Sequence, residues 1–287
     1  MRDYRWPAPA KLNLFLHITA RRADGYHELQ TVFQLLDVGD RLHIAPRSDG
    51  LIHRLDALPG VAAEDDLCIR AAHLLRSACG GAARGAAKGA DIGVDKRLPL
   101  GGGLGGGSSD AATVLLVLDQ LWGCDLGIER LAELGARLGA DVPVFVRGHS
   151  AWAEGVGERL QALDLPPRHY LVASPGVAVS TAEIFAAAEL TRDCPPITIR
   201  GFLAGGGQNV CQPVVALRYP QVARLLDWLA ARRQVAEVAM SGTGSSCYAA
   251  FDDPRDARRA LGELPPEWRG FVARGVARSP LRCMLRS

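Results

Sequence analysis

The chain has 287 residues and a formal net charge of +2, and 48% of its residues are hydrophobic while 22% are charged. This balance is typical of a soluble globular protein with one large or two ordinary domains. The near-neutral charge, without any basic block, argues against a nucleic-acid-binding protein, and no apolar run approaches the roughly 20 residues of a membrane-spanning helix.

The N-terminus and the cysteines bear on the compartment. The first ten residues, MRDYRWPAPA, are polar and contain proline, so we expect no secretory signal peptide. The seven cysteines are widely spaced and form neither a C-x-x-C motif nor a zinc-binding spacing. We therefore expect a cytoplasmic protein whose thiols are reduced and serve mostly as small core residues.

The first predicted element is a β-strand over residues 6–20, where apolar side chains alternate with others. On such a strand Lys11 and Asn13 project from the same face, two residues apart. Only three of the 33 basic residues are lysine, so a lysine that is present indicates a need for a compact ammonium group. The pair suits a charged substrate, although an edge-strand lysine that faces water would show the same pattern.

The segment after this strand, R-R-A-D-G-Y-H at residues 21–27, contains the Asp-Gly signal of a hairpin turn. Tyr26 and His27 follow the turn directly. An aromatic ring beside an imidazole can stack on a planar heterocycle and hydrogen-bond to its edge. The alternative is a turn aromatic that covers the edge of the core.

Several short elements are predicted between this turn and residue 98. The patterns favour strands over 29–36, 40–46, 51–55 and 90–98, a helix over 64–78 and a low-complexity loop over 80–90. Lys96 lies near the end of the last strand. We expect its side chain either beside the ligand of the loop that follows or in solvent.

A glycine-rich stretch, P-L-G-G-G-L-G-G-G-S-S-D-A-A, occupies residues 99–112 and continues into an apolar helical segment. Glycine permits positive φ, and Ser108, Ser109 and Asp110 are residue types that begin helices. Free backbone N–H groups at a helix N-terminus bind anions. The stretch therefore predicts a phosphate-binding loop, with a flexible linker as the alternative.

The residues on both sides of the glycine-rich stretch limit which type of phosphate-binding loop it can be. No Gly-Lys-Ser/Thr follows the glycines, which excludes a Walker A loop. Gly101, Gly103 and Gly106 fit the dinucleotide pattern G-x-G-x-x-G, but so glycine-rich a run fits many patterns. The preceding segment 91–95 alternates polar and apolar residues, whereas a parallel Rossmann strand is almost wholly apolar.

A candidate functional carboxylate follows the next helix, which is predicted over 127–138. The chain then reads L-G-A-D-V-P-V-F-V, so Asp141 lies between a helix end and a predicted strand over 144–146, with Pro143 fixing the backbone. A carboxylate at such a junction is well placed to act on a ligand. An N-cap or turn aspartate is the alternative.

The composition becomes proline-rich near residues 163–168, and we place a domain boundary between residues 150 and 165. A second glycine/serine loop, at residues 240–246, is flanked by apolar strand. Mixed strands and helices predict an α+β fold in both halves. The remaining elements are predicted as strands over 170–174 and 270–278, helices over 180–190, 221–231 and 256–264, and a loop over 194–207.

Three segments together resemble the three motifs of the GHMP small-molecule kinases: P-A-K-L-N-L at 9–14, the glycine stretch at 99–112 and M-S-G-T-G-S-S at 240–246. Three more resemble one family within them, the 4-diphosphocytidyl-2-C-methyl-D-erythritol kinases. They are R-A-D-G-Y-H at 22–27, L-G-A-D-V-P-V-F at 138–145 and A-E-G-V-G-E at 153–158. The resemblance covers nearly the whole chain.

The resemblance implies a two-domain α+β fold with a ribosomal-protein-like ATP-binding domain at 1–155, a ferredoxin-like domain at 156–287 and the active site in the cleft between them. It implies transfer of the ATP γ-phosphate to the 2-hydroxyl of a CDP-linked methylerythritol, in the non-mevalonate route to isoprenoid precursors. ATP and Mg²⁺ would be the cofactors, and we assign no direct metal ligand. The partner would be a small molecule, not nucleic acid or membrane, and the protein a monomer or weak homodimer.

The resemblance also implies roles for individual residues. Asp141 matches the catalytic base and Lys11 the catalytic lysine. Tyr26 and Phe185 match a pair that sandwiches cytosine, His27 hydrogen-bonds its edge, and Asn13, Phe33 and Thr181 complete the substrate side. Lys96 and Asp66 fall near the adenine. The ATP phosphate loop matches Pro99, Leu100, Gly101, Gly102, Gly103, Leu104, Gly105, Gly106, Gly107, Ser108 and Ser109.

Two other functions stay open. Another GHMP kinase would act on a mevalonate derivative, homoserine or a sugar, but such substrates have no base for Tyr26, His27 and Phe185 to bind. A non-catalytic nucleotide-binding module would need neither Lys11 nor Asp141. The segment Q-N-V-C-Q at 208–212 departs from the family, which usually has acidic residues after the asparagine.

Overall fold

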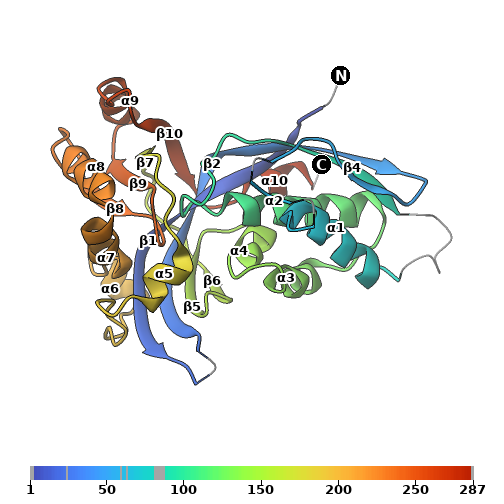
Figure 1. Cartoon of the computed structure of the whole chain (residues 1–287), viewed down its shortest axis with the longest axis horizontal. Helices are drawn as coiled ribbons and strands as arrows, with labels where there is room; N and C mark the ends of the chain where they lie inside the picture. The colour runs from blue at the N-terminus through green and yellow to red at the C-terminus, as the bar shows by residue number, and fades with distance from the viewer. Residues whose placement is uncertain (1–2, 24, 59, 63, 81–87, 286–287) are drawn as a thin grey trace.

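The computed structural model describes residues 3–23, 25–58, 60–62, 64–80 and 88–285. Asp24 of the expected hairpin turn and residues 81–87 of the expected low-complexity loop lie outside the described residues. The described strands form one 10-stranded sheet in the order β3-β4-β2-β10-β7-β9-β8, with β1 and β5 paired to β2 and with β6 paired to β5. Figure 1 shows helices α1 to α4 gathered at one end of the molecule and α5 to α9 at the other.

The elements of the first half are β1 (Trp6–Arg21), β2 (His27–Arg47), β3 (Ile52–Arg54), α1 (Leu67–Ala78), β4 (Gly89–Asp95), α2 (Gly106–Leu121), α3 (Ile128–Ala136), α4 (Val142–Arg147) and β5 (Ala151–Gly155). Those of the second half are β6 (Arg159–Ala162), β7 (His169–Ser174), α5 (Thr181–Ala186), α6 (Ile199–Leu203), α7 (Cys211–Arg218), α8 (Pro220–Ala230), β8 (Glu237–Met240), β9 (Cys247–Phe251), α9 (Pro254–Gly262), β10 (Arg269–Val276) and α10 (Pro280–Met284). None of the described helices is both long and apolar enough to cross a membrane.

Two long antiparallel strands, β1 and β2, run through both ends of the molecule (Figure 1). Along its other edge β2 pairs in turn with β5 over residues 29–33, with β10 at Leu35 and Leu36, and with β4 over residues 41–47. The sequence patterns predicted two separate strands here, over 29–36 and 40–46, because residues 37–39 interrupt the apolar run. In the structure the strand continues through them.

The apolar core has three parts, and β1 contributes to all of them. Trp6 and Ala8 pack with α1 to α4 in the first cluster, whereas Leu16 and Ile18 pack with α5, α7, α8 and α9 in the second. Burial of such faces is the main stabilising contribution in a domain of this size. The segment of β1 that carries Lys11 and Asn13 is part of the third cluster, through Ala10, Leu12 and Leu14.

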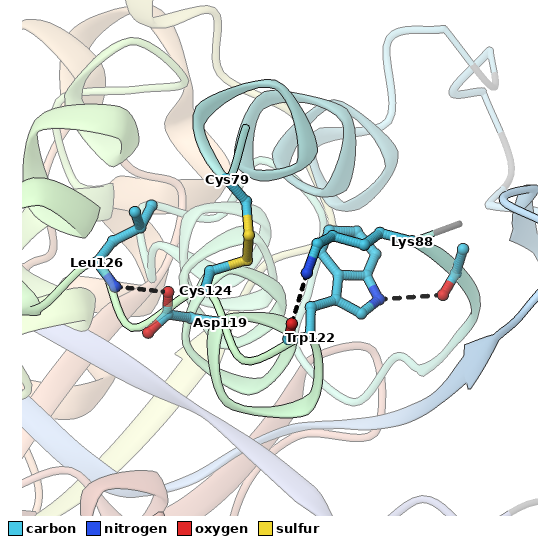
Figure 2. Close-up of a disulfide and its surroundings, with 7 residues drawn as sticks. Cys79, Lys88, Asp119, Trp122, Cys124 and Leu126 are labelled. Atoms are coloured by element: carbon cyan, nitrogen blue, oxygen red, sulfur yellow. Dashed lines mark hydrogen bonds between the residues drawn. A yellow bond between two sulfur atoms is a disulfide. The ribbon is translucent and has the colours of Figure 1, made fainter. Parts of the chain in front are cut away.

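The prediction that all cysteines are reduced is wrong. Cys79, which caps the C-terminus of α1, forms a disulfide with Cys124, which follows α2, and Figure 2 shows the bond between the two helices. The two residues are 45 positions apart, and helix packing brings their Cα atoms to 5.3 Å. The spacing of the cysteines in the sequence does not indicate this pairing, because it depends on how the two helices pack. The other five cysteines carry free thiols, and four of them are buried as expected.

The strand predicted over 144–146 is also wrong, because these residues belong to helix α4. A short apolar run has no period that distinguishes a buried strand from a buried helix. Pro143 lies in the first turn of α4, where proline is tolerated because the N–H group there has no helical partner. The helix predicted over 180–190 ends at Ala186, and the loop predicted over 194–207 contains α6, which Thr198 caps.

The glycine-rich stretch does lead into a helix, but the helix begins earlier than the serines predicted. Gly105 occupies the N-cap position in the left-handed region, with φ of 70°, and α2 begins at Gly106. Ser109 and Asp110 lie inside the first turns and are buried. The glycines, rather than a serine cap, therefore set the start of this helix.

Candidate active site

The side chains of Lys11 and Asp141 meet although 130 positions separate them. Lys11 Nζ lies 3.1 Å from a carboxylate oxygen of Asp141, and Asn13 Oδ1 accepts a hydrogen bond of 2.5 Å from the same ammonium group. Lys11 is 3% exposed, which excludes the edge-strand lysine that faces water. A buried ammonium needs such partners, because desolvation without them is costly.

The local structure directs the Asp141 carboxylate toward Lys11. Asp141 precedes α4, but among the described residues its side chain makes no capping hydrogen bond, so the N-cap alternative does not hold. The Lys11 N–H donates to the carbonyl of Leu104 at 3.0 Å, which fixes β1 against the glycine-rich loop. Asn13 Nδ2 donates to Thr31 Oγ1 at 2.9 Å, which orients the amide.

A cavity of about 810 Å³ opens beside this pair. Its walls come from both halves of the chain, and most of the predicted site residues line it. The predicted residues among its lining are Lys11, Asn13, Tyr26, His27, Phe33, Gly101, Gly103, Ser108, Asp141, Thr181 and Phe185. The structure thus brings the three motifs and the turn aromatics together at one site.

Two glycines of the glycine-rich loop, Gly103 and Gly105, are tightly enclosed. Gly103 has φ of 74°, and a Cβ atom there would lie 2.2 Å from the carbonyl oxygen of Ser241. Gly105 also has positive φ, and its Cβ would lie 2.8 Å from the Phe145 ring. A side chain at Gly103 would push the loop away from Ser241, and one at Gly105 would push it away from Phe145. These glycines therefore let backbone amides approach the cavity.

The second glycine/serine loop, at residues 240–246, packs directly on the first. Ser241 Oγ donates to the carbonyl of Gly103 at 2.8 Å, and the N–H of Ser246 donates to the carbonyl of Gly102 at 3.2 Å. The atypical segment at 208–212 supports this loop, because Asn209 Nδ2 donates to the carbonyls of Met240 and Gly242 at 2.7 and 2.8 Å. The sequence patterns gave no role to Asn209 or Ser241.

The other end of the cavity is aromatic. The rings of His27 and Phe185 stack with centroids 5.2 Å apart and planes inclined by 24°, while Tyr26 beside them is 65% exposed. His27 Nε2 has no hydrogen-bond partner among the described residues. Burial, together with the guanidinium groups of Arg192 and Arg21, lowers the pKa of His27 from its usual 6.5. The ring is therefore neutral at physiological pH.

Ten of the predicted residues are not among the described residues that line this cavity: Lys96, Asp66 and eight residues of the glycine-rich loop. Of these eight, Pro99, Leu100 and Leu104 line a second cavity together with Lys96. The Lys96 ammonium bonds to the carboxylates of Asp40 and Asp110, so it is not a solvated lysine. Asp66 caps α1 by accepting from the N–H of Cys68 and pairs with Arg54 at 2.9 Å.

The Lys96 ammonium group and its two carboxylate partners, Asp40 and Asp110, lie beside Gly106 of the glycine-rich loop. Asp40 also accepts from the N–H groups of Arg97 and Leu98 at 2.6 and 2.9 Å, which anchors the chain where it enters the loop. Burial raises the pKa of Asp110 to about 7 in spite of Lys96. Asp40 was missed because the sequence pattern indicated it only as the first residue of the strand predicted over 40–46.

Comparisons with known proteins agree with this geometry. Residues 66–149 match the family described as GHMP kinases N terminal domain, and residues 199–269 match GHMP kinases C terminal. The chain is 58% identical to 4-diphosphocytidyl-2-C-methyl-D-erythritol kinase of Halorhodospira halophila over 98% of this chain and 96% of the relative. It is 57% identical to the protein of the same name from Nitrosococcus oceani, over 94% of each chain.

Solved structures give the same answer at the level of the fold. A crystal structure of 4-(cytidine 5'-diphospho)-2C-methyl-D-erythritol kinase has a TM-score of 0.81 and 36% identity, and the match covers 94% of this chain and 98% of that one. The mevalonate kinase of Methanococcus jannaschii has a TM-score of 0.66 at 15% identity, covering 93% and 96%. The second likeness supports the two-domain GHMP kinase fold alone.

Proposed function

Because this chain belongs to the family of 4-diphosphocytidyl-2-C-methyl-D-erythritol kinases, we propose that it transfers the γ-phosphate of ATP to the 2-hydroxyl of that CDP-linked sugar alcohol. One observation carries the proposal. A single cavity holds an ammonium–carboxylate pair beside a glycine-rich loop and a stacked imidazole–phenyl pair at a distance from it. The first arrangement suits phosphoryl transfer, and the second suits a nucleobase.

The glycine-rich loop would bind the phosphates of ATP. Its backbone conformation leaves N–H groups at the N-terminus of α2, a helix of 16 residues whose dipole favours negative charge at that end. We place Pro99 to Ser109 against the triphosphate. Lys96 and Asp66 would lie on the adenine side, and Lys96 would act there while bound to Asp40 and Asp110.

The paired side chains would act on the acceptor hydroxyl. Asp141 would accept the hydroxyl proton or orient the hydroxyl for attack, and Lys11 would stabilise the negative charge on the transferred group. In phosphoryl transfer such positioning and charge balance supply most of the catalysis. Asn13, which accepts from Lys11 and donates to Thr31, would hold the ammonium in place.

Mg²⁺ would arrive bound to ATP and neutralise part of the charge on its phosphates. Among the described residues there is no group of three or more His, Cys, Asp or Glu side chains that could hold a metal ion. Magnesium commonly needs only one or two carboxylates besides phosphates and water. The Asp141 carboxylate, one-third exposed to the cavity, fits that requirement.

The aromatic end would select the CDP-linked substrate. Cytosine would stack on Phe185 and Tyr26, and the unpartnered Nε2 of the neutral His27 would hydrogen-bond to its edge. Phe33 and Thr181, which line the walls between the two ends, would contact the sugar and phosphates. A mevalonate, homoserine or sugar kinase would have no use for the stacked rings, so this end favours the CDP-linked substrate over the other GHMP substrates.

We also propose a domain division at residues 155 and 156 and activity as a monomer or weak homodimer. Both halves of this chain contribute walls to the cavity, so one protomer supplies the catalytic pair, part of the phosphate loop and the aromatic end. The first three residues of the A-E-G-V-G-E segment end β5 and pair with β2. Sedimentation of the active enzyme would test the assembly.

A coupled ADP-release assay tests the function. We expect ADP release with the CDP-linked substrate and Mg²⁺, and little release with the same sugar phosphate lacking cytidine. Lys11→Ala and Asp141→Asn should each lower kcat by about 10² to 10⁴-fold. Equal turnover of both acceptors would contradict the role of the aromatic end, and wild-type kcat in both variants would contradict the mechanism.

A further inference from the structure

Three serines in the loop at residues 240–246 are buried, yet their hydroxyl groups have different partners. Ser241 Oγ bonds to the glycine-rich loop and to β1. Ser245 Oγ donates to the carbonyl of Val177 at 2.5 Å, within the second half of the chain. Ser246 Oγ finds no partner among the described residues. Only the first of these hydroxyl groups connects motifs of the active site.

The Ser241 hydroxyl joins two parts of the site that the sequence keeps far apart. It donates to the carbonyl of Gly103 at 2.8 Å and accepts from the N–H of Asn13 at 3.1 Å. Gly103 belongs to the loop proposed to hold phosphates, and Asn13 bonds to the Lys11 ammonium. One oxygen atom therefore spans the gap between the phosphate loop and the catalytic pair.

The backbone of Ser241 is itself held firmly. Its N–H donates to the carbonyl of Ser246 at 2.9 Å, and its own carbonyl accepts from Gly244 at 3.0 Å. Asn209 fixes the residues on both sides of it, Met240 and Gly242. Ser241 is fully buried, so water cannot readily replace its hydroxyl. The position of Gly103 relative to β1 is therefore set from the second half of the chain.

We propose that Ser241 is a positioning residue, whose hydroxyl group holds the phosphate loop at a fixed distance from Lys11 and Asn13. The proposal rests on the proposed kinase function. Without the hydroxyl, the Gly103 carbonyl and the Asn13 N–H lose a buried partner, and the loop shifts relative to the catalytic pair. A misplacement of about 1 Å in an active site can cost about 10²-fold in rate.

The test compares Ser241→Ala with Ser245→Ala, which deletes the same atom from the same loop. We expect Ser241→Ala to lower kcat by about 10- to 100-fold and to raise the Kd for ATP by about 10-fold. The KM for the CDP-linked substrate should stay within about twofold. The control variant Ser245→Ala should change kcat and the ATP Kd by less than about twofold. Ser241→Cys, nearly equal in volume but a weak donor, serves if the alanine variant does not fold.

Two readouts separate this inference from the proposed function. Kinetics use the CDP-linked substrate, whereas calorimetric titration of ATP needs no acceptor. Absence of turnover in the wild-type enzyme would overturn the kinase function, while weaker ATP binding by Ser241→Ala alone would still support the positioning role. Equal effects of Ser241→Ala and Ser245→Ala on kcat and ATP binding, at matched thermal stability, would overturn the inference.

Discussion

The disulfide between α1 and the end of α2 should stabilise the protein without influencing catalysis. Reduction, or the double substitution Cys79→Ser and Cys124→Ser, would release a constraint across 45 residues of sequence. The loop-closure entropy of a chain segment of that length corresponds to about 4 kcal/mol in the free energy of unfolding at 25 °C. The bond follows the C-terminal end of α2, whereas the phosphate loop precedes the other end. At 1.5 Å per residue, the 16 residues of α2 separate the two by about 24 Å.

Urea unfolding with and without dithiothreitol measures the stability difference, and thiol titration in denaturant counts free cysteines. We expect five thiols before reduction and seven after it. Cys283→Ser, at an exposed free cysteine, is the matched control and should leave the unfolding free energy unchanged. Reduced protein with seven titratable thiols and undiminished stability would refute the entropy argument. A large fall in kcat, at a urea concentration where the reduced protein remains folded, would refute the separation from catalysis.

Further predictions concern the aromatic end and the support of the second loop. Phe185→Ala should raise the KM for the CDP-linked substrate by about 10- to 100-fold, the cost of losing one base-stacking partner, and an equal rise in the KM for ATP would argue against that role. Because the pKa of His27 is lowered from 6.5, the ring should stay neutral as the pH falls from 8 to 6.5 and gain a proton only below that range. The KM for the CDP-linked substrate should accordingly be flat above pH 6.5 and rise below it in the wild type, and His27→Gln should abolish the rise. Asn209→Ala, which removes three buried hydrogen bonds, should lower the unfolding free energy by about 3 kcal/mol in a denaturant titration. Unchanged stability would mean that Asn209 does not support the loop.

Local patterns predicted those parts of the site that depend on local geometry. The alternation of β1 placed Lys11 and Asn13 on one face, and the glycine content of residues 99–112 predicted tight backbone turns before a helix. Both predictions are confirmed, because strand alternation and positive φ act within a few residues. The meeting of Lys11 with Asp141 was expected only from the family resemblance, since it depends on how α4 packs.

Contacts between distant segments account for what the sequence did not indicate. The helical state of residues 144–146 depends on packing against α2 and α3, since a short apolar run fits either structure. Ser241 bonds to Gly103, which is 138 residues away in the sequence, and to Asn13, which is 228 residues away. No local pattern distinguishes its hydroxyl group from those of Ser245 and Ser246. The sequence pattern placed Lys96 beside a ligand or in solvent, but it did not indicate the ion pairs that Lys96 forms. Its partners, Asp40 and Asp110, lie on two other elements, β2 and α2.

The shared use of β1 bears on any attempt to dissect the molecule. A gene cut at the proposed boundary would yield a C-terminal fragment that lacks Leu16 and Ile18, two buried members of its own apolar cluster. Such a fragment would leave a hydrophobic groove uncovered and would precipitate or recruit the missing strand from elsewhere. Co-expression of both pieces, rather than purification of each alone, is thus the route by which a severed enzyme could reassemble.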